Sequence, residues 1–236
     1  MDTPYVEIAL GVVRSTQEEA AQRFAGIPVL VTATRQTAGR GRSGARWEHA
    51  DRSVAASLAF RTSWPPPQRA RLTLVAGLAA ADVLGPAVRL KWPNDLVIDG
   101  LKVGGLLTEA DGDLIVAGLG VNLFWPAPIE GAGALADADP GPEAAARIAR
   151  LWAKRLLRRS GGDPESWGRE EYTARCATVG SAVEWSGGGC GRAVGVAADG
   201  GLEVETPDGP LILRAGEVRE VRPAAGERLQ GPGSRY

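Results

Sequence analysis

The amino-acid sequence predicts an α+β fold in which a sheet with flanking helices is followed by a small β domain. Up to about residue 176, segments with a helical spacing of apolar residues alternate with short runs rich in β-branched residues. The runs between residues 88 and 123 follow one another through short turns, which indicates an antiparallel meander. After about residue 177 only short strands and glycine-rich turns remain, which is typical of a small antiparallel barrel or sheet.

The first regular element is expected to be a short helix that begins after Arg14. Ser15 with Glu18, or Thr16 with Glu19, matches a capping box, in which a hydroxyl and a carboxylate satisfy the free N–H groups of the first turn. A glycine at position 26 is a natural stop for this helix.

Strands and further helices follow up to residue 176. Apolar and β-branched runs predict strands at residues 27–34, 53–60, 88–92, 95–99, 101–110 and 114–123. Asp-Gly pairs at residues 99–100 and 111–112 predict hairpin turns between the last of these strands. The spacing of apolar residues predicts helices at 65–85 and 143–159, with a loop at 126–142 and a further short helix around 165–175.

The C-terminal part divides into strands and a tail. Strands are expected at residues 181–185, 191–198, 201–206, 210–214 and 217–221. Residues 224–236 have no apolar pattern and are expected to be frayed. The domains predicted are therefore 1–176, 177–223 and a flexible tail from 224 to 236.

Composition places the chain among ordinary globular proteins. Its 236 residues are 44% hydrophobic and 23% charged, enough for one large domain or for one domain with a small module. The formal net charge of −1 lacks the basic excess of most nucleic-acid-binding proteins, so we expect a small anionic ligand and no nucleic-acid partner. No apolar run approaches the roughly 20 residues of a membrane-spanning helix, and the N-terminus lacks the features of a signal peptide. We therefore expect a cytoplasmic protein with no membrane partner.

The cysteines give no sign of a metal site. Cys176 and Cys190 do not form a CxxC pair, and the one histidine, His49, completes no usual zinc-binding pattern with them. A disulfide between the two would be unusual in a cytoplasmic protein. We expect no dedicated metal ligands.

A glycine- and arginine-rich loop, QTAGRGRSGARW at residues 36–47, is the first candidate site. Its glycines let backbone N–H groups converge on an anion, and Arg40, Arg42 and Arg46 add charged hydrogen bonds to phosphate or carboxylate. No Lys-Ser/Thr follows, so the loop is not a Walker A motif. The alternatives are a solvated surface loop and an Arg-Gly segment of the kind found in nucleic-acid-binding proteins, although the basic surroundings of such segments are missing here.

The stretch KWPNDLVIDGLKVGGLLTE at residues 91–109 is the second candidate. Its Pro-Asn-Asp triplet predicts a turn between two strands. Lys91 and Asp95 could form a simple ion pair at the strand end. Alternatively, Asp95 and Lys102 belong to a ligand site, because the glycine pair after Lys102 weakens a strand and often marks the close approach of a ligand.

A third motif, GLGVN at residues 118–122, again places glycines within a strand, although a β-bulge would explain them as well. Taken together and in this order, QTAGRGRSG-x-x-W, KWPNDL, K-x-GGLL-x-E and GLGVN resemble the biotin protein ligase family. The resemblance covers nearly the whole chain. It implies a catalytic domain of the class II synthetase-like biotin/lipoate ligase type and a C-terminal SH3-like β-barrel.

The resemblance also implies the activity of a biotin–[acetyl-CoA-carboxylase] ligase. Such enzymes join biotin and ATP into biotinoyl-5′-AMP with Mg²⁺, and then transfer biotin to a lysine of the biotin carboxyl carrier domain of a carboxylase. We expect a monomer or homodimer of the monofunctional type, because the chain begins at the ligase core and shows no DNA-binding module. The alternatives are a lipoate or octanoate ligase, which the GRGR loop and KWPND disfavour, and a non-catalytic biotin or nucleotide sensor, which Lys102 and Asp95 disfavour.

Catalytic roles carried over by resemblance fall on Lys102, Arg40, Arg42 and Asp95. The three cations would neutralise the biotin carboxylate and the reacting phosphate. Asp95 would orient or deprotonate the incoming lysine, or would only hold the turn. Lys91 would be structural.

Binding roles carried over in the same way form two groups. The biotin-binding residues implied are Ser15, Thr16, Gln36, Gly39, Arg40, Trp47, Lys102, Leu106, Gly118 and Gly120. The residues implied for ATP and the adenylate are Arg40, Arg42, Arg46, Trp47, Asp95, Lys102 and Asn122. Helix capping alone would also explain Ser15 and Thr16. One position departs from the family loop, because Ala45 stands where the family has its next arginine and Arg46 follows it.

Overall fold

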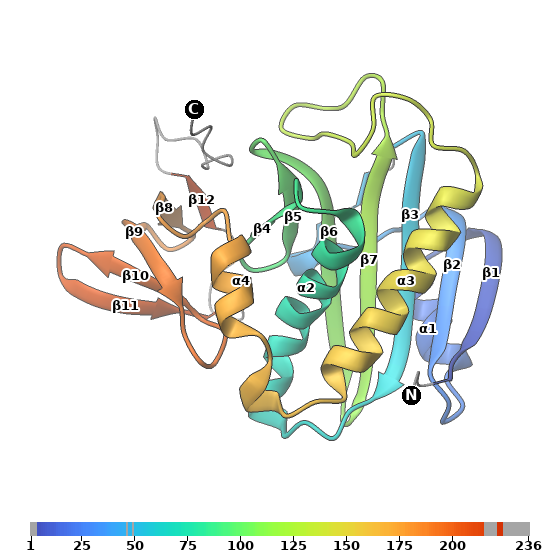
Figure 1. The fold of residues 1–236 in the computed structure, drawn as a ribbon, viewed down its shortest axis with the longest axis horizontal. Coiled ribbons are helices and arrows are strands. Elements are labelled where there is room, and N and C mark those ends of the chain that lie inside the picture. Colours follow the sequence, from blue (N-terminus) through green and yellow to red (C-terminus); the bar gives the residue numbers. More distant parts are fainter. Residues whose placement is uncertain (1–3, 46, 49, 215–220, 224–236) are drawn as a thin grey trace.

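Two β-sheets organise the chain in the computed structural model, which describes residues 4–45, 47–48, 50–214 and 221–223 (Figure 1). The larger sheet has seven strands in the order β1-β2-β3-β7-β6-β5-β4, and the smaller has five in the order β11-β10-β9-β8-β12. Helices cover the larger sheet, which confirms the predicted α+β class. The cysteines are free thiols, Cys176 buried and Cys190 exposed. Within the described ranges, no helix has the length and apolar character needed to cross a membrane.

The larger sheet is mixed. Its strands are β1 (Val6–Val13), β2 (Val29–Gln36), β3 (Arg52–Arg61), β4 (Arg89–Lys91), β5 (Asp95–Ile98), β6 (Leu101–Asp111) and β7 (Leu114–Phe124). Neighbours pair antiparallel except β1 and β2, which run parallel. Sequence patterns predicted each of these strands except β1. Because parallel neighbours need a crossover connection, the helix that follows β1 is what joins it to β2.

The helices lie on both faces of this sheet. They are α1 (Thr16–Arg23), α2 (Leu72–Leu84), α3 (Glu143–Ser160) and α4 (Arg169–Arg175), with short 3₁₀ turns η1 (Arg42–Gly44), η2 (Pro66–Arg71) and η3 (Pro164–Ser166). α2 and α3 lie across one face of the sheet (Figure 1), and their residues share the main apolar core with alternate residues of β3 and β7. α1 covers part of the opposite face, where Ala20 packs with Ala59 and Val116. The helix predicted at 65–85 is thus η2 followed by α2, and it ends at Gly85, whose φ is +97°.

The predicted capping box at the start of α1 is wrong. Ser15 is the N-cap residue, with extended φ and ψ of −156° and 130°, but its side chain makes no capping hydrogen bond. The Thr16 hydroxyl bonds to Gln36 and Ser57 instead. Neither hydroxyl therefore caps the helix, and both residues line a neighbouring cavity.

Glycines share one face in the middle of the larger sheet. In the strand register Gly118 lies opposite Ser57, and Gly120 lies opposite Gly105. Because side chains alternate along a strand, these residues share the α1 face, away from α2 and α3. Because glycine has no side chain, this face of the sheet leaves open space between α1 and β5. The surface formed there by Gly105, Gly118 and Gly120 is called the glycine floor below.

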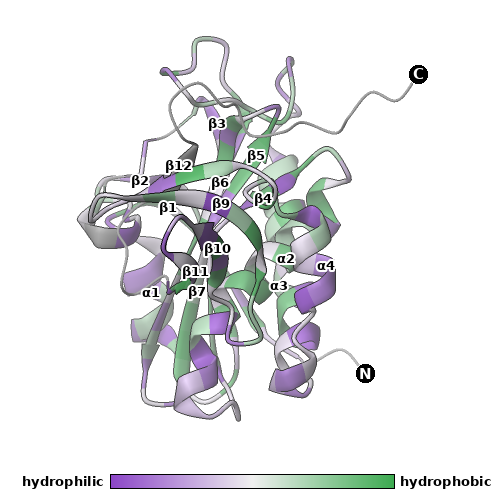
Figure 2. Cartoon of the chain, turned by 90° about the vertical axis from the view of Figure 1, so that its left-hand side faces the viewer, coloured by the Kyte–Doolittle hydropathy of each residue, from purple (hydrophilic) through white to green (hydrophobic). Residues whose placement is uncertain are grey.

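The smaller sheet contains β8 (Ala182–Trp185), β9 (Gly189–Val196), β10 (Leu202–Thr206), β11 (Gly209–Leu213) and β12 (Val221–Pro223). Figure 2 views the molecule from the side of this sheet. All its pairings are antiparallel, and within the described ranges its end strands β11 and β12 do not pair. The antiparallel sheet is confirmed, whereas closure into a barrel is not. The strand predicted at 217–221 and the tail at 224–236 lie largely or wholly outside the described residues.

Candidate active site

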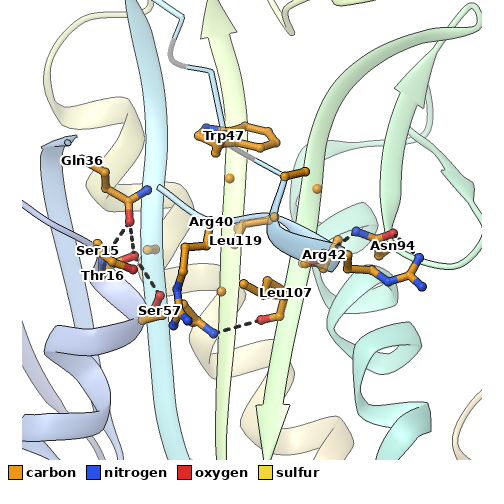
Figure 3. Close-up of a pocket in the computed structure, with 18 of the residues that line it drawn as sticks. Ser15, Thr16, Gln36, Arg40, Arg42, Trp47, Ser57, Asn94, Leu107 and Leu119 are labelled. Carbon is orange, nitrogen blue, oxygen red and sulfur yellow. Dashed lines mark hydrogen bonds between the residues drawn. The ribbon is translucent and has the colours of Figure 1, made fainter. Parts of the chain in front are cut away.

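A cavity of about 550 Å³ lies on the glycine floor (Figure 3). Among the residues that line it are most of those singled out in the sequence: Ser15, Thr16, Gln36, Arg40, Arg42, Trp47, Asp95, Lys102, Leu106, Gly118 and Gly120. These residues come from segments far apart in the chain. The sheet brings them together, because β2 and β5 are separated only by β3, β7 and β6, about 19 Å at the usual strand spacing.

A directed chain of hydrogen bonds forms the end of the cavity near α1. Ser57 Oγ donates to Thr16 Oγ1 at 2.8 Å, and Thr16 Oγ1 donates to Gln36 Oε1 at 3.1 Å. The backbone N–H of Thr16 also donates to Gln36 Oε1, at 2.8 Å. This pairing directs the Gln36 oxygen toward Thr16, so the Nε2 hydrogens of Gln36 are left for another acceptor.

Unpaired polar atoms at the same end indicate a polar ligand. Ser15 is 1% exposed and Gln17 is 5% exposed, and Ser15 Oγ and Gln17 Oε1 are buried without a hydrogen-bond partner among the described residues. A buried polar atom without a partner costs about 1–3 kcal/mol, which a ligand with complementary groups would recover.

Gln17 also joins α1 to an arginine of the glycine-rich loop. Its Nε2 donates to Glu109 Oε2 at 3.0 Å and to the Val116 carbonyl at 3.2 Å. The same Glu109 oxygen accepts from Arg40 Nη2 at 3.0 Å. Sequence reasoning missed Gln17, Glu109 and Ser57 as site residues. The sequence signals for the first two were the adjacency of Gln17 to the Ser15-Thr16 pair and the position of Glu109 at the end of the K-x-GGLL-x-E motif.

The other end of the cavity is charged. Lys102 Nζ lies 2.6 Å from Asp95 Oδ1, with side chains 43% and 20% exposed. Asp95 thus pairs with Lys102, although its partner in the strand register is Lys91. Because the Lys102 ammonium stays partly exposed while it is paired with Asp95, it can also meet an anion in the cavity.

Arg42 reaches the same end from η1. Its Nη1 donates to Asn94 Oδ1 at 3.4 Å, and Asn94 Nδ2 donates to the Leu106 carbonyl at 2.9 Å. Burial lowers the pKa of the Arg42 guanidinium from its ordinary value, and the nearby Asp95 carboxylate opposes that shift. A guanidinium that has lost part of its hydration favours the arrival of a further anion.

Trp47 lies over the glycine floor (Figure 3). A Cβ atom at Gly120 would come within 2.8 Å of its ring, and one at Gly105 within 3.4 Å. Lys102 Nζ stands 5.8 Å from the centroid of the ring, within the range of a cation–π contact. The indole therefore forms one wall of the cavity, and the glycines make room for it.

Two predicted residues, Gly39 and Asn122, are placed differently. Gly39 is not among the residues that line the cavity but packs against two that are, since a Cβ atom there would lie 3.2 Å from both Gln36 Nε2 and Trp47 Cβ. Asn122 is 3% exposed and donates to the Gly133 carbonyl at 2.9 Å, which ties β7 to the 126–142 loop. Arg46 lies outside the described residues, so the role in binding ATP that the resemblance implies for it stays a prediction.

Leu106 contributes little side chain to the cavity. It is 3% exposed and belongs to the main core, and its backbone N–H donates to the Asn94 carbonyl at 2.8 Å. The alternation of β6 turns Leu107 to the cavity face instead, opposite Gly118. The apolar side chain on the cavity face is therefore that of Leu107, one residue from the predicted Leu106.

The charges and hydrogen bonds suit a ligand with two different ends. The end at Thr16 and Gln36 offers hydrogen-bond donors and acceptors in a buried setting, and the end at Arg42 and Lys102 offers positive charge. Within the described ranges, no group of three or more His, Cys, Asp or Glu side chains could hold a metal ion. Such a site can bring two anionic groups together and neutralise both.

Comparison with known proteins agrees with this description. A profile of the biotin/lipoate A/B protein ligase family matches residues 10–122. A biotin–[acetyl-CoA-carboxylase] ligase of Mycobacterium tuberculosis is 31% identical over 82% of this chain and 79% of its own length. One of Paracoccus denitrificans is 31% identical over 89% and 95%. The structure of a biotin protein ligase from Aquifex aeolicus in complex with biotin and ATP superposes with a TM-score of 0.75 at 25% identity, covering 93% of this chain and 99% of that one.

Proposed function

The chain belongs to the biotin/lipoate A/B protein ligase family, and we propose that its cavity joins biotin to ATP and then transfers biotin to a protein lysine. Within the family it is an ATP-dependent biotin–protein ligase, with biotin and ATP as substrates. One observation carries the residue assignments below. A single cavity has a buried hydrogen-bonding end at Thr16 and Gln36 and a cationic end at Arg42 and Lys102.

The hydrogen-bonding end suits the ureido head of biotin. The head offers two N–H donors and a carbonyl acceptor, and Ser15, Thr16 and Gln36 supply complementary groups. Gln17 faces the same region with an unpaired oxygen. The glycine at 118 lets the bicyclic ring lie on the sheet, beside Leu107 and the indole of Trp47.

The cationic end suits the reacting groups. In the first step a biotin carboxylate oxygen forms a bond to the α-phosphorus of ATP, the α–β bridging P–O bond breaks, and pyrophosphate leaves. Two anions must meet for this step, and Arg40, Arg42 and Lys102 lower the repulsion between them. Because Lys102 is held by Asp95 at 2.6 Å, its ammonium is already placed before the substrates arrive.

The second step transfers the biotinoyl group. The amine of the acceptor lysine forms a bond to the biotinoyl carbonyl carbon, the acyl–phosphate bond breaks, and AMP leaves. We assign Asp95 to this step, where its carboxylate orients the amine or accepts its proton. Its position at the same end as Lys102 supports the assignment.

Mg²⁺ would come with the nucleotide rather than occupy a protein site. Asp95 is the carboxylate among the residues that line the cavity, and it is paired with Lys102. Magnesium usually binds through substrate phosphates and water with one or two carboxylates. When bound, it would neutralise phosphate charge, and no step above depends on it.

Several wider assignments are part of the same proposal. The acceptor would be the biotin carboxyl carrier domain of a carboxylase, and the protein would act in the cytoplasm as a monomer or homodimer without binding specific DNA sequences. Residues 177–223 would form an SH3-like domain, and the antiparallel sheet there supports this. Asn122 and Trp47 would contact the nucleotide, and the burial of Asn122 Oδ1 without a partner among the described atoms supports the role of Asn122.

Pyrophosphate exchange tests the activity directly. We expect radiolabelled pyrophosphate to enter ATP in the presence of biotin and not in the presence of lipoate, because Thr16 and Gln36 match a ureido group that lipoate lacks. Absence of biotin-dependent exchange would sink the proposal. Equal exchange with lipoate would favour the lipoate ligase alternative, and mass spectrometry of a carrier domain after incubation with MgATP would identify the acid transferred.

Replacing Thr16 with valine should weaken biotin binding. The change keeps the volume but breaks the chain from Ser57 to Gln36. We expect the KM for biotin to rise about tenfold, since polar groups left unpaired cost about 1–3 kcal/mol. Steady-state exchange rates at varied biotin measure this. Thr37→Val is the control, because that hydroxyl is exposed and donates to the Val13 carbonyl at a long 3.4 Å. Equal KM values in the two variants would remove Thr16 from the biotin site.

A further inference from the structure

The turn that carries Asn94 and Asp95 is held from outside the cavity by the C-terminal part of the chain. Trp92, which is 1% exposed, comes directly after β4 and just before this turn. Its indole Nε1 donates to the Gly200 carbonyl at 2.9 Å, and its backbone N–H donates to Thr178 Oγ1 at 3.0 Å. Both partners follow residue 176, so they belong to the chain that forms the smaller sheet.

The tip that carries Gly200 is docked against α2. It lies at the tip between β9 and β10 with a φ of +85°, and a Cβ atom there would come within 2.9 Å of Leu74 Cδ1 on α2. Thr178 is 1% exposed. Trp92 therefore has one hydrogen-bond acceptor on the docked tip and a second on the segment that leads into β8.

On its inner side the same turn sets the cationic end of the cavity. Asn94 accepts from Arg42 through Oδ1 and exchanges hydrogen bonds with Leu106. Asp95 pairs with Lys102. The positions of Arg42 and Lys102 thus depend on a turn two to three residues from Trp92.

The turn has little support from the sheet alone. β4 is a three-residue edge strand, Arg89–Lys91, and β5 is its one strand neighbour in the larger sheet. On its free edge, Leu90 bridges to Cys176 and its carbonyl accepts from the Ala177 backbone at 2.7 Å. A short edge strand has few ladder hydrogen bonds of its own, so contacts with the C-terminal segment make up much of its restraint.

We propose that Trp92 is a positioning residue for adenylation, through which the C-terminal sheet holds the Asn94–Asp95 turn and so places Arg42 and Lys102. The inference rests on the proposed function. The biotin head binds at the far end of the cavity, on α1 and β2, so the loss of this restraint should slow the reaction without weakening biotin binding.

Trp167 offers a matched control. It is 3% exposed, and its indole Nε1 donates to the Ala198 carbonyl at 3.1 Å, on the same β9–β10 tip. It lies between η3 and α4, and among the described residues its indole hydrogen bond goes to the tip and not to the Asn94–Asp95 turn. Trp167→Phe therefore removes the same kind of hydrogen bond from the same tip without freeing the turn.

The test compares Trp92→Phe and Trp167→Phe in biotin-dependent pyrophosphate exchange, with Thr178→Val as a second way to release Trp92. We expect Trp92→Phe to lower kcat about tenfold through misplacement of the charged groups, with the KM for biotin within about twofold of wild type. Thr178→Val should lower kcat in the same direction, and Trp167→Phe should leave it within about twofold of wild type. Circular dichroism and thermal midpoints identify the variants that fold, and Thr178→Val carries the test if Trp92→Phe does not.

Three results would overturn the inference. The first is an equal loss of kcat in Trp92→Phe and Trp167→Phe, and the second is an unchanged kcat in Trp92→Phe or, if that variant does not fold, in Thr178→Val. The third is an effect that lies wholly in the KM for biotin. If wild-type protein itself shows no exchange, the proposed function fails instead. The two failures are therefore distinguishable.

Discussion

Replacing Lys102 with alanine is expected to lower the rate of adenylate formation by at least about a hundredfold, the loss typical of removing one preorganised charged or hydrogen-bonding group at a reacting centre. The Lys102 ammonium lies at the cationic end of the cavity and is held at 2.6 Å by Asp95. Its loss removes a positive charge where two anions must meet, and it leaves the Asp95 carboxylate to repel them. Single-turnover formation of biotinoyl-5′-AMP measures this without interference from product release.

Lys91→Ala is the matched control for Lys102. Lys91 is the last residue of β4, and it faces Asp95 in the register of β4 and β5 without lining the cavity. We expect the rate of adenylate formation by Lys91→Ala to stay near that of the wild-type protein. A near wild-type single-turnover rate in Lys102→Ala would show that Lys102 is a bystander, and an equal loss in both variants would show that general positive charge matters rather than its position.

Valine in place of Gly118 is expected to block the cavity from its floor. A Cβ atom at Gly118 would lie 2.8 Å from Gln17 Oε1 and 3.4 Å from Ser57 Oγ. A branched side chain would therefore both displace Gln17 and occupy the space where the biotin ring would lie. We expect kcat/KM for biotin to fall on the order of a hundredfold, about 3 kcal/mol at the upper end of overpacking costs.

Calorimetry with biotin alone separates this effect from a loss of catalysis, because no chemical step takes place without ATP. Gly11→Val serves as the control, since Gly11 lies in edge strand β1 and a Cβ atom there would meet nothing within 4 Å. Biotin binding by Gly118→Val with wild-type affinity would rule out the proposed position of the ring.

Local patterns predicted most of the strands and helices for a clear physical reason. β-branched runs favour extended backbone, and apolar residues at helical spacing predict the faces that α2 and α3 bury. Local patterns did not predict β1, because it is an edge strand whose residues are mostly exposed. The exposed fraction is 48% for Val6 and 65% for Val12. Its place in the sheet comes from parallel pairing with β2, which a local pattern does not encode.

The capping box failed for a related reason. The sequence offers a hydroxyl and a carboxylate at the right spacing, and that spacing is the usual signal for a cap. In the folded chain the Thr16 hydroxyl meets Ser57, which is 41 residues away in sequence, and Gln36. The Thr16 hydroxyl therefore forms hydrogen bonds with residues of other strands and not with the first turn of its own helix.

The sequence by itself determined the α+β class, the order of the motifs and, through them, the family and most of the residues that line the cavity. Only the tertiary structure decided how those residues are joined: the chain from Ser57 to Gln36, the contact between Gln17 and Glu109 across 92 residues, and the hold of the C-terminal segment on Trp92. The physical reason is that propensity and periodicity act between near neighbours in the chain. Hydrogen bonds in this site join strands that become neighbours only when the sheet has formed.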